Sequence, residues 1–593
     1  MPALHQWDYL FAFGTIFAAL DAYNIGQYSS SRLRRVLSLI KNIVEGANDV
    51  ANSFATSVSS KSLTMLQACM AAALMEFLGG VLVGARVSGT IKNSIVTIDA
   101  FQNNAGVQLL GFTVALCCSA TWLMIATRNS WPVSTTYSIV SAVAGVGVAV
   151  GGKDAVQWGW NNGSGLATIF AGFIIAPGIS AGFAAVIYLL TKYCVLLRKN
   201  SLRAGFATVP VFFFGVTAIL TMCIIWKGSP TLKLKELPGN ITAAAILGTA
   251  AVVTVLSLIF WLPFVYVKTV RNDYTVKFYH FFLGPLLWWR QPPADALVTD
   301  ISAVPDYHVI HEGHDSRPAD TAKEEKLASE DASSDGKEES PADAPPATRS
   351  STAPASKNDP HPIVGAWYLP RNIYIFFRFK FAALLYKALT HGTTIDIHKL
   401  QTEGSDQKRL RAMHERAKQY DNKTEHLYSF LQVMTACTAS FAHGANDLGN
   451  AVGPYSAIYA VWSTGVAAGK QSETPVWILV VGALFLVIGL ATYGYNIMAV
   501  LGNRMTLHSP SRGYSMELGS AITVILASQY AIPVSTTMCI TGATLGVAMC
   551  NNDLKSFNWR GLGWIVLGWV LTVPIAGVSA GCVMGIILHA PHF

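Results

Sequence analysis

The sequence predicts an all-α polytopic membrane protein with about ten to twelve transmembrane helices plus re-entrant half-helices. Three observations predict this class: an apolar composition, a series of long apolar segments, and two motifs that each occur twice. Of 593 residues, 52% are hydrophobic and 13% are charged, whereas about a quarter are charged in a typical soluble protein. The chain therefore has too few charged side chains to cover a large soluble fold.

The apolar segments are each long enough to cross about 30 Å of hydrocarbon. Segment 5–25 lacks a basic lead and a small-residue cleavage site, so we interpret it as a retained span and not as a signal peptide. A half-helix around Asn48 or Asn446 would resemble a short span in hydropathy. The predicted spans are 5–25, 63–85, 107–127, 132–151, 166–193, 207–226, 243–268, 427–442, 475–501, 515–531, 533–550 and 562–589.

Basic residues orient the predicted spans. They gather in loop 192–206 and on both flanks of the long polar interval, and the positive-inside rule makes these regions cytoplasmic. The loops one span away contain sequons at Asn162 and Asn240, which suit an outside face, and we attribute a third sequon at Asn422 to chance. The predicted organisation is an N-terminal membrane repeat with accessory helices at 1–268, a cytoplasmic loop at 269–425 and a C-terminal membrane repeat at 426–593.

The cytoplasmic loop is the only sizeable soluble part of the predicted protein. Residues 294–360 are rich in Asp, Glu, Ser, Ala and Pro and poor in large apolar residues, so we expect them to be disordered. We interpret the loop as a tether between the repeats, and regulation through Ser/Thr phosphorylation is the alternative. Phe278–Trp289 and Ile373–Leu389 mix aromatic with basic residues, which predicts interfacial helices on the inner leaflet.

The first repeated motif combines two amides with a carboxylate. It reads Ala-Asn-Asp-Val-Ala-Asn-Ser at 47–53 and Ala-Asn-Asp-Leu-Gly-Asn-Ala at 445–451. On a helix, the two Asn positions share one face and the Asp lies about 100° away, so all three side chains can converge on a small ligand. The candidate residues are Asn48, Asp49 and Asn52 in the first copy and Asn446, Asp447 and Asn450 in the second.

The second repeated motif is Pro-Val-Ser-Thr-Thr. It occurs at 132–136, 83 positions after Asp49, and at 533–537, 86 positions after Asp447. Two motifs that recur in one order at nearly one spacing indicate an internal duplication. A Pro followed by Ser and Thr also suits the start of a helix, where free N–H groups and hydroxyls form an anion site.

Charge decides which ligands these motifs suit. Helix N-termini, hydroxyls and amides favour an oxyanion, while Asp49 and Asp447 would repel it unless a hard cation binds their carboxylates. Anion and cation binding would then be coupled, and symport follows if only the fully loaded and the empty protein change face. Transporters built from repeats place such sites at the interface between the repeats.

Both motifs resemble those of the inorganic phosphate transporter family of sodium-phosphate symporters. Leu4–Tyr9, Gly84–Ser88 and the acidic central loop are similar to its fungal high-affinity members. The resemblance implies two inverted repeats, a homodimer in the membrane, and import of inorganic phosphate with sodium across the plasma membrane. By the same resemblance, sodium is bound by Asn48, Asp49, Asn446 and Asp447, phosphate by Asn52, Ser134, Thr135, Thr136, Asn450, Ser535, Thr536 and Thr537, and Glu76 and Glu517 match glutamates needed for transport.

One departure from the family pattern interrupts the first motif. Family members run from Asn-Ile-Gly straight into Ala-Asn-Asp, but here the 20 residues 27–46 separate Gly26 from Ala47. The segment is Arg-rich, ends in a second Gly, and has no counterpart in the second repeat. We interpret it as a short intron left in the gene model, and a genuine lineage insertion is the alternative.

Two other functions are open alternatives. One is a transporter of phosphate with protons, or of sulfate, because hydroxyls and helix ends discriminate poorly between tetrahedral anions. The other is a phosphate sensor that does not transport. The sequence contains no nucleophile paired with a base and no P-loop, so we expect no enzyme activity. We also expect no cofactor other than the coupling sodium, no Cys or His metal set, and no nucleic-acid partner.

Overall fold

The structure is a computed structural model, and the residues that it describes form helices joined by turns and loops. Several sequence predictions fall outside these residues: the span at 5–25, the insert at 27–46, Asn48, Asn162 and most of 294–360. The described residues are 49–84, 88–89, 91, 95–96, 98–101, 103–160, 165–225, 238–292, 302–307, 369–380, 393, 395, 397, 407–469, 474–530, 532–551 and 553–589.

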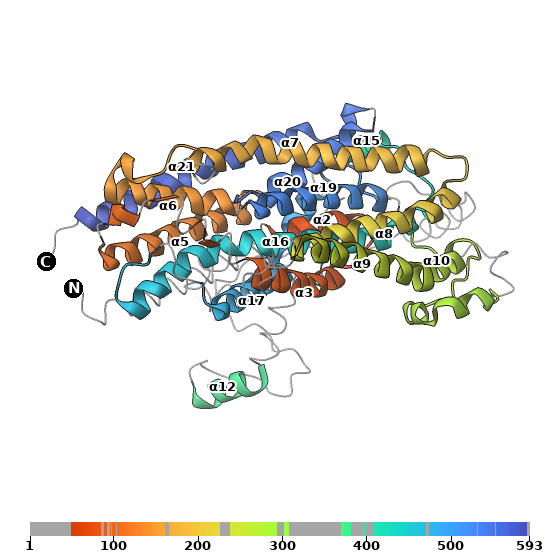
Figure 1. Ribbon diagram of the computed structural model, residues 1–593, viewed down its shortest axis with the longest axis horizontal. Helices are drawn as coiled ribbons and strands as arrows, with labels where there is room; N and C mark the ends of the chain where they lie inside the picture. The colour runs from red at the N-terminus through yellow and green to blue at the C-terminus, as the bar shows by residue number, and fades with distance from the viewer. Residues whose placement is uncertain are drawn as a thin grey trace, which may run out of the picture. The chain divides into compact units, whose positions relative to one another are not determined.

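The described helices follow the predicted spans from 63–85 onward (Figure 1), with one exception in α16. Before the central loop the order is α2 (Val50–Ser59), α3 (Met65–Val83), η2 (Ile98–Phe101), α5 (Ala105–Arg128), α6 (Thr135–Gly151), η3 (Lys153–Ala155), α7 (Leu166–Thr191), η5 (Lys192–Leu196), α8 (Ser201–Ile225), α9 (Gly239–Leu256), η8 (Ser257–Trp261), α10 (Leu262–Thr269) and η9 (Phe278–Trp289). After it the order is α15 (Gln407–Glu415), α16 (Asn422–Thr464), α17 (Val476–Tyr493), α18 (Tyr495–Leu501), α19 (Pro510–Gln529), α20 (Thr536–Met549), η12 (Leu554–Ser556) and α21 (Trp559–His589).

Helix α16 is far longer than the span predicted at 427–442. It continues for 43 residues through the second Asn-Asp motif, with Pro454 in its interior. The prediction was wrong because Gly444 and Asn446 lower the local hydropathy, although the Asn446 amide is bound by the Val534 carbonyl of another segment. Asn446 therefore lies inside a continuous helix and not in a half-helix. The first motif differs, because Asp49 caps the start of the 10-residue helix α2.

Several of the described helices can cross a membrane. Six are long and apolar enough by length and composition: Met65–Val83, Ala105–Arg128, Leu166–Leu196, Ser201–Ile225, Gly239–Thr269 and Trp559–His589. Helices α6, α17 and α20 are also apolar but shorter. The chain is therefore an all-α membrane protein, as the sequence predicted.

The same order of elements occurs in both halves of the chain. In each half, two helices joined through Pro-Val-Ser-Thr-Thr are followed by a 3₁₀ turn and a long helix, as α5–α6–η3–α7 and as α19–α20–η12–α21. An isolated antiparallel bridge flanks each unit, Val96 with Val156 and Thr506 with Phe557. The long helices exchange partners, because α7 packs along α19 and α20 while α21 packs along α5 and α6.

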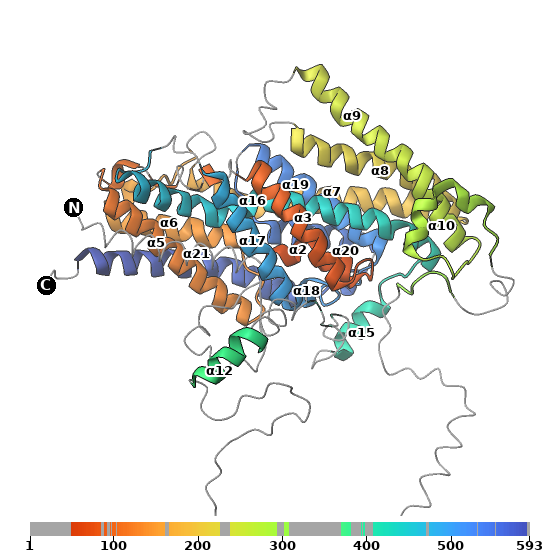
Figure 2. The same cartoon turned by 90° about the horizontal axis from the view of Figure 1, so that it is seen from below.

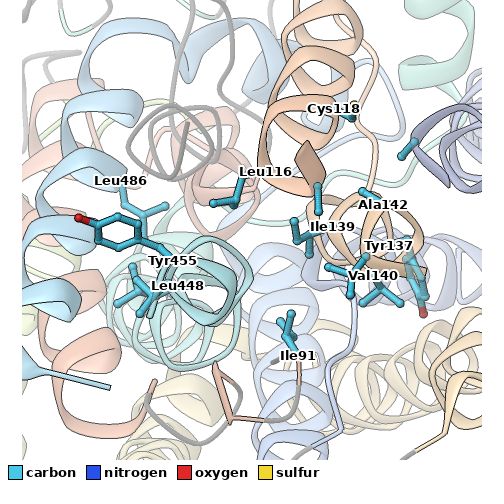
Figure 3. Close-up of a cluster of buried hydrophobic side chains, with 14 of the residues drawn as sticks. Ile91, Leu116, Cys118, Tyr137, Ile139, Val140, Ala142, Leu448, Tyr455 and Leu486 are labelled. Atoms are coloured by element: carbon cyan, nitrogen blue, oxygen red, sulfur yellow. The ribbon is translucent and has the colours of Figure 1, made fainter. Parts of the chain in front are cut away.

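The functional motifs sit in the most buried part of the chain. Helix α16 is contacted by α2, α3, α5, α8, α17 and α19, and it runs through the interior in both ribbon views (Figures 1 and 2). In Figure 3, Leu448 and Tyr455 of α16 lie beside Leu486 of α17, while Ile139 of α6 lies near Leu116 of α5. This apolar packing holds the polar face of α16 against its neighbours.

Part of the predicted disordered loop follows a defined path. The side chain of Asn422 accepts a hydrogen bond from the backbone N–H of Tyr307 at 2.9 Å and donates one to the Pro305 carbonyl at 2.8 Å. The Tyr307 hydroxyl is 2.6 Å from Nδ1 of His426. Residues 302–307 are therefore bound by the start of α16, and the disorder of most of 294–360 stays a prediction.

The two predicted interfacial helices are helical where the structure describes them. Phe278–Trp289 forms 3₁₀ turns with a kink at Gly284, where φ is +51°. In a separate unit of the chain, α12 (Pro370–Ile375) continues into η10 (Phe376–Lys380), and the rest of 373–389 lies outside the described residues.

Candidate functional site

Both Pro-Val-Ser-Thr-Thr segments start helices, as predicted. Ser134 caps α6, and its hydroxyl oxygen accepts a hydrogen bond from the Tyr137 backbone N–H at 3.3 Å. Ser535 caps α20 in the same way through Met538, also at 3.3 Å. The two serines thus cap the helices, and the hydroxyls of the threonines that follow them are available to contact the aspartates.

The first aspartate is bound by hydroxyls from both halves of the chain. Thr135 of α6 donates to Oδ2 of Asp49, and Thr537 of α20 donates to Oδ1 at 2.5 Å. Asp49 is buried, with 1% of its surface exposed. One of its two hydroxyl partners therefore comes from its own repeat and the other from the opposite repeat.

The second aspartate repeats this arrangement with the halves interchanged. Thr536 of α20 donates to Oδ2 of Asp447 at 2.6 Å, and Thr136 of α6 donates to Oδ1 at 3.2 Å. In both cases the first threonine serves its own repeat and the second threonine crosses over. The sequence duplication is therefore reproduced at the level of single hydrogen bonds.

The asparagines of the motifs leave acceptors without partners. The amide nitrogen of Asn52 donates to the Thr537 hydroxyl at 2.7 Å, and that of Asn450 donates to the Thr136 hydroxyl at 3.0 Å. The side-chain oxygens of Asn52, Asn446 and Asn450 are buried and accept no hydrogen bond from the described residues. Buried acceptors without donors are costly, and a bound cation would satisfy them.

Glu76 reaches the second motif through a histidine. The Glu76 carboxylate on α3 is 2.7 Å from Nδ1 of His443, and Nε2 of the same ring is 3.0 Å from Oδ2 of Asp447. The hydroxyl of Ser440 also donates to Glu76, at 2.8 Å. From the sequence, His443 was noted beside the second Asn-Asp motif and interpreted as a packing or hydrogen-bonding residue. Its position four residues before Asp447, one helical turn away, was the available signal for a contact with that aspartate.

Glu517 lies in a separate ring of donors. Thr56 and Ser57 of α2 donate to its carboxylate, as do Gln432 and Thr435 of α16, at 2.5 to 3.2 Å. None of these residues belongs to the repeated motifs, and the sequence did not single them out. Glu517 is thus hydrogen-bonded to α2, the helix of the first Asn-Asp motif. Glu76 is instead hydrogen-bonded to His443, which lies next to the second Asn-Asp motif.

The carboxylates and the imidazole form a candidate cation site. Asp49, His443 and Asp447 are all buried, and each offers one ligand atom within 4.8 Å of the others. The sequence predicted Asp49 and Asp447 as sodium ligands, but it did not include His443 among them. The cluster contains two carboxylates and one imidazole. Its carboxylates attract a cation and repel an anion, so we expect a cation to bind first.

A small pocket with a mostly apolar lining and a few polar side chains adjoins this cluster. It lies between α2, α16, α19 and α20, which Figure 2 shows close together, and it includes the unpartnered oxygen-bearing side chain of Asn52. Its polar lining residues are Asn52, Ser53, His443, Ser520 and Thr536. Hydroxyls and amides beside a helix start are suited to hold an oxyanion.

Comparison with known protein families shows to which family the chain belongs. A model described as the phosphate transporter family matches residues 45–580. The chain belongs to this family. The match confirms the resemblance drawn from the motifs, because it spans both copies of each.

Relatives of this phosphate transporter family member align over nearly its whole length. It is 41% identical to the phosphate-repressible phosphate permease pho-4 of Neurospora crassa, with 100% of this chain and 99% of that protein covered. It is 27% identical to sodium-dependent phosphate transporter 2 of Xenopus laevis, with 91% and 94% covered. It is 26% identical to sodium-dependent phosphate transporter 1 of Homo sapiens, with 90% and 92% covered.

A solved structure shares the fold of this family member. The structure is described as the sodium-dependent phosphate transporter, and it matches with a TM-score of 0.56 at 23% identity. The match covers 98% of this chain and 100% of the other. The helical architecture described above is therefore that of a known membrane transporter fold.

Proposed function

We propose that the chain imports inorganic phosphate across the plasma membrane together with sodium. The observation that carries this proposal is the pair of related sites around Asp49 and Asp447, each with a carboxylate, an unpartnered asparagine oxygen and two threonine hydroxyls. Carboxylate and amide oxygens suit a hard cation such as sodium. The names of the relatives agree with phosphate and sodium as the transported species.

Coupling between the ions follows from the hydrogen bonds. The hydroxyls of the four threonines donate to the aspartates, from Thr135, Thr136, Thr536 and Thr537. A sodium ion on each carboxylate would replace these donors, and the released hydroxyls at the starts of α6 and α20 would then donate to phosphate. Each ligand therefore improves the site for the other, which is the condition for symport.

The assignment of the asparagines is refined by this scheme. Because Asn52 and Asn450 direct their amide nitrogens to threonines and leave their oxygens without partners, we assign these oxygens to sodium. The hydroxyls of the threonines remain the phosphate ligands. Asn446 joins the sodium ligands of Asp447 by the same argument, and Asn48 is assigned by analogy with Asn446.

The wider organisation is also a proposal. We infer two inverted membrane repeats at 1–268 and 426–593, a cytoplasmic loop at 269–425, and a homodimer in the plasma membrane. The exchange of the long helices α7 and α21 between the halves supports the repeats. The basic flanks of the loop support its cytoplasmic side.

The test is uptake of radiolabelled phosphate by cells that lack their own transporters, with sodium or with choline. We expect sodium-dependent uptake that is lowered more than tenfold by Asp49→Asn and by Asp447→Asn, because loss of one partner of a buried charge pair costs about 2–5 kcal/mol. The matched control is Asp154→Asn, at an exposed aspartate, which should leave uptake unchanged.

Other outcomes would point elsewhere. Equal uptake in sodium and choline that rises in acid would indicate proton coupling, and uptake of sulfate in place of phosphate would change the anion. Normal sodium-dependent uptake by both Asp variants would remove the cation assignment. Surface expression without any uptake would favour a sensor.

A further inference from the structure

The starting observation is a buried carboxylate that makes no hydrogen bond to the described residues of the repeated motifs. Glu76 has 0% of its surface exposed. Among the described residues, its hydrogen-bond partners are Ser440 and His443, which both belong to α16. A buried carboxylate is costly unless it is paired. Whatever Glu76 contributes to the ion site must therefore pass either through these partners or through its charge alone.

His443 provides a continuous path from Glu76 to the second aspartate. Nδ1 of the ring is hydrogen-bonded to Glu76 Oε2 at 2.7 Å, and Nε2 is 3.0 Å from Asp447 Oδ2, an ion-pair distance without hydrogen-bond geometry. Because an imidazole is rigid, a bond that fixes one ring nitrogen also fixes where the other nitrogen points. Carboxylates that hold histidines in this way tune many ion sites from outside the ligand shell.

The close packing of α3 against α16 keeps this path short. A Cβ added at Gly444 would lie 2.4 Å from the Glu76 carbonyl oxygen, and one added at Gly79 would lie 2.1 Å from the Phe441 carbonyl oxygen. Only glycine allows the two backbones to approach so closely at both positions. The distance between Glu76 and His443 is thus set by the crossing of two helices.

The path distinguishes the two otherwise matching aspartates. Asp447 has the imidazole nitrogen within 3.0 Å in addition to its two threonines. For Asp49, the hydrogen-bond donors among the described residues are Thr135, Thr537 and Asn52. Among the described residues, the imidazole therefore lies closest to Asp447, at 3.0 Å, while its ligand atom is also within 4.8 Å of Asp49.

We propose that Glu76 is a positioning residue that sets the sodium affinity of the Asp447 site through His443. Glu76 orients the ring, and the ring holds Asp447 Oδ2 where a cation can use it. This proposal rests on the proposed function. The competing explanation is that Glu76 attracts sodium directly through its negative charge, without any need for the histidine.

A double-mutant cycle separates these explanations. The proteins are the purified full chain and its variants Glu76→Gln, His443→Gln and the combination of both. Sodium binding is read as the sodium concentration that gives half of the maximal thermal stabilisation, with choline keeping the ionic strength constant. This readout does not require the variants to transport.

If Glu76 acts through His443, each single variant raises the half-maximal sodium concentration by about tenfold or more, as expected for one hydrogen bond to a charged group. The double variant then matches the single variants. The matched control is Ser440→Ala, which removes the other donor to Glu76 and should change the sodium concentration less than twofold. Phosphate affinity at saturating sodium should stay the same in Glu76→Gln, because Glu76 does not line the cavity beside the site.

Effects of Glu76→Gln that persist unchanged in the His443→Gln background would overturn the proposal, because a direct charge effect does not need the ring. An unchanged sodium response in Glu76→Gln alone would also overturn it. Thermal melting in choline checks that each variant is folded. If His443→Gln is not folded, the double-mutant cycle is repeated with His443→Asn. An original chain with no sodium response would instead refute the proposed function.

Discussion

Replacing Gly444 by alanine tests how the crossing of α3 and α16 supports the site. The new Cβ would lie 2.4 Å from the Glu76 carbonyl oxygen and 2.9 Å from the Glu76 Cα. Both atoms belong to the backbone, so no side-chain rotation can relieve the contact. The two helices must move apart by about 1 Å to restore an ordinary van der Waals distance.

The cost has two parts. Overpacking of this kind destabilises a protein by about 1–3 kcal/mol, and the better helix propensity of alanine returns up to about 1 kcal/mol. The same shift lengthens the 2.7 Å contact between Glu76 and His443 to a distance that is no longer a strong hydrogen bond. We therefore expect a lower melting temperature together with a weaker sodium response.

The assay is thermal melting of the purified protein at several sodium concentrations, followed by phosphate uptake in cells. The matched control is Gly215→Ala in α8, where an added Cβ meets no atom within 4 Å; its melting temperature should not fall. A Gly444→Ala variant that melts and responds to sodium like the original chain would refute the reasoning, because it would mean that the crossing relaxes without disturbing the site.

Two further predictions concern Asp273 and the insert at 27–46. Burial raises the pKa of Asp273, but hydrogen bonds from Thr275 and Arg290 outweigh burial and hold the pKa below its ordinary value of 3.8. Its stabilising contribution is therefore complete above about pH 4 and is lost as the pH falls through the lower folded value. Hydrogen exchange of residues 270–292 should accelerate only below pH 4, and Arg290→Ala should accelerate it at neutral pH; equal exchange in both proteins would contradict this. Removal of residues 27–46 should raise sodium-dependent uptake about tenfold or more, because a displaced binding residue can cost about a hundredfold, whereas removal of 320–339 should not. Sequencing the transcript decides the origin of the insert, since a message that keeps all 20 codons excludes a retained intron.

Much of the site followed from the sequence because short motifs carry strong local rules. Ser134 and Ser535 cap helices as Pro-x-Ser-Thr-Thr predicts, since proline and a short hydroxyl side chain favour that position whatever surrounds them. The recurrence of the two motifs in one order, 83 and 86 positions apart, also predicted an internal duplication. Within each half, a hydrogen bond joins the two motifs, from Thr135 to Asp49 and from Thr536 to Asp447.

The rest depends on packing between distant segments, which spacing does not specify. Thr136 and Thr537 each donate a hydrogen bond to the aspartate of the other half. These bonds depend on how the starts of α6 and α20 are placed relative to each other. The role of His443 requires α3 to lie against α16 at a particular height. The length of α16 was missed because hydropathy treats its buried polar residues as exposed, whereas partners on other helices satisfy them.

The crossed threonines bear on how such a chain arose. A half-length ancestor with one copy of each motif would have given its aspartate one hydroxyl, and a second copy facing it would have supplied the other. Two identical subunits would thus have formed the complete site before the genes fused. Fusion then freed the copies to diverge, and the second half now carries His443 four residues before its aspartate, whereas the insert at 27–46 precedes the motif of the first half. The histidine marks a difference between the two ion sites that a symmetric ancestor could not have had.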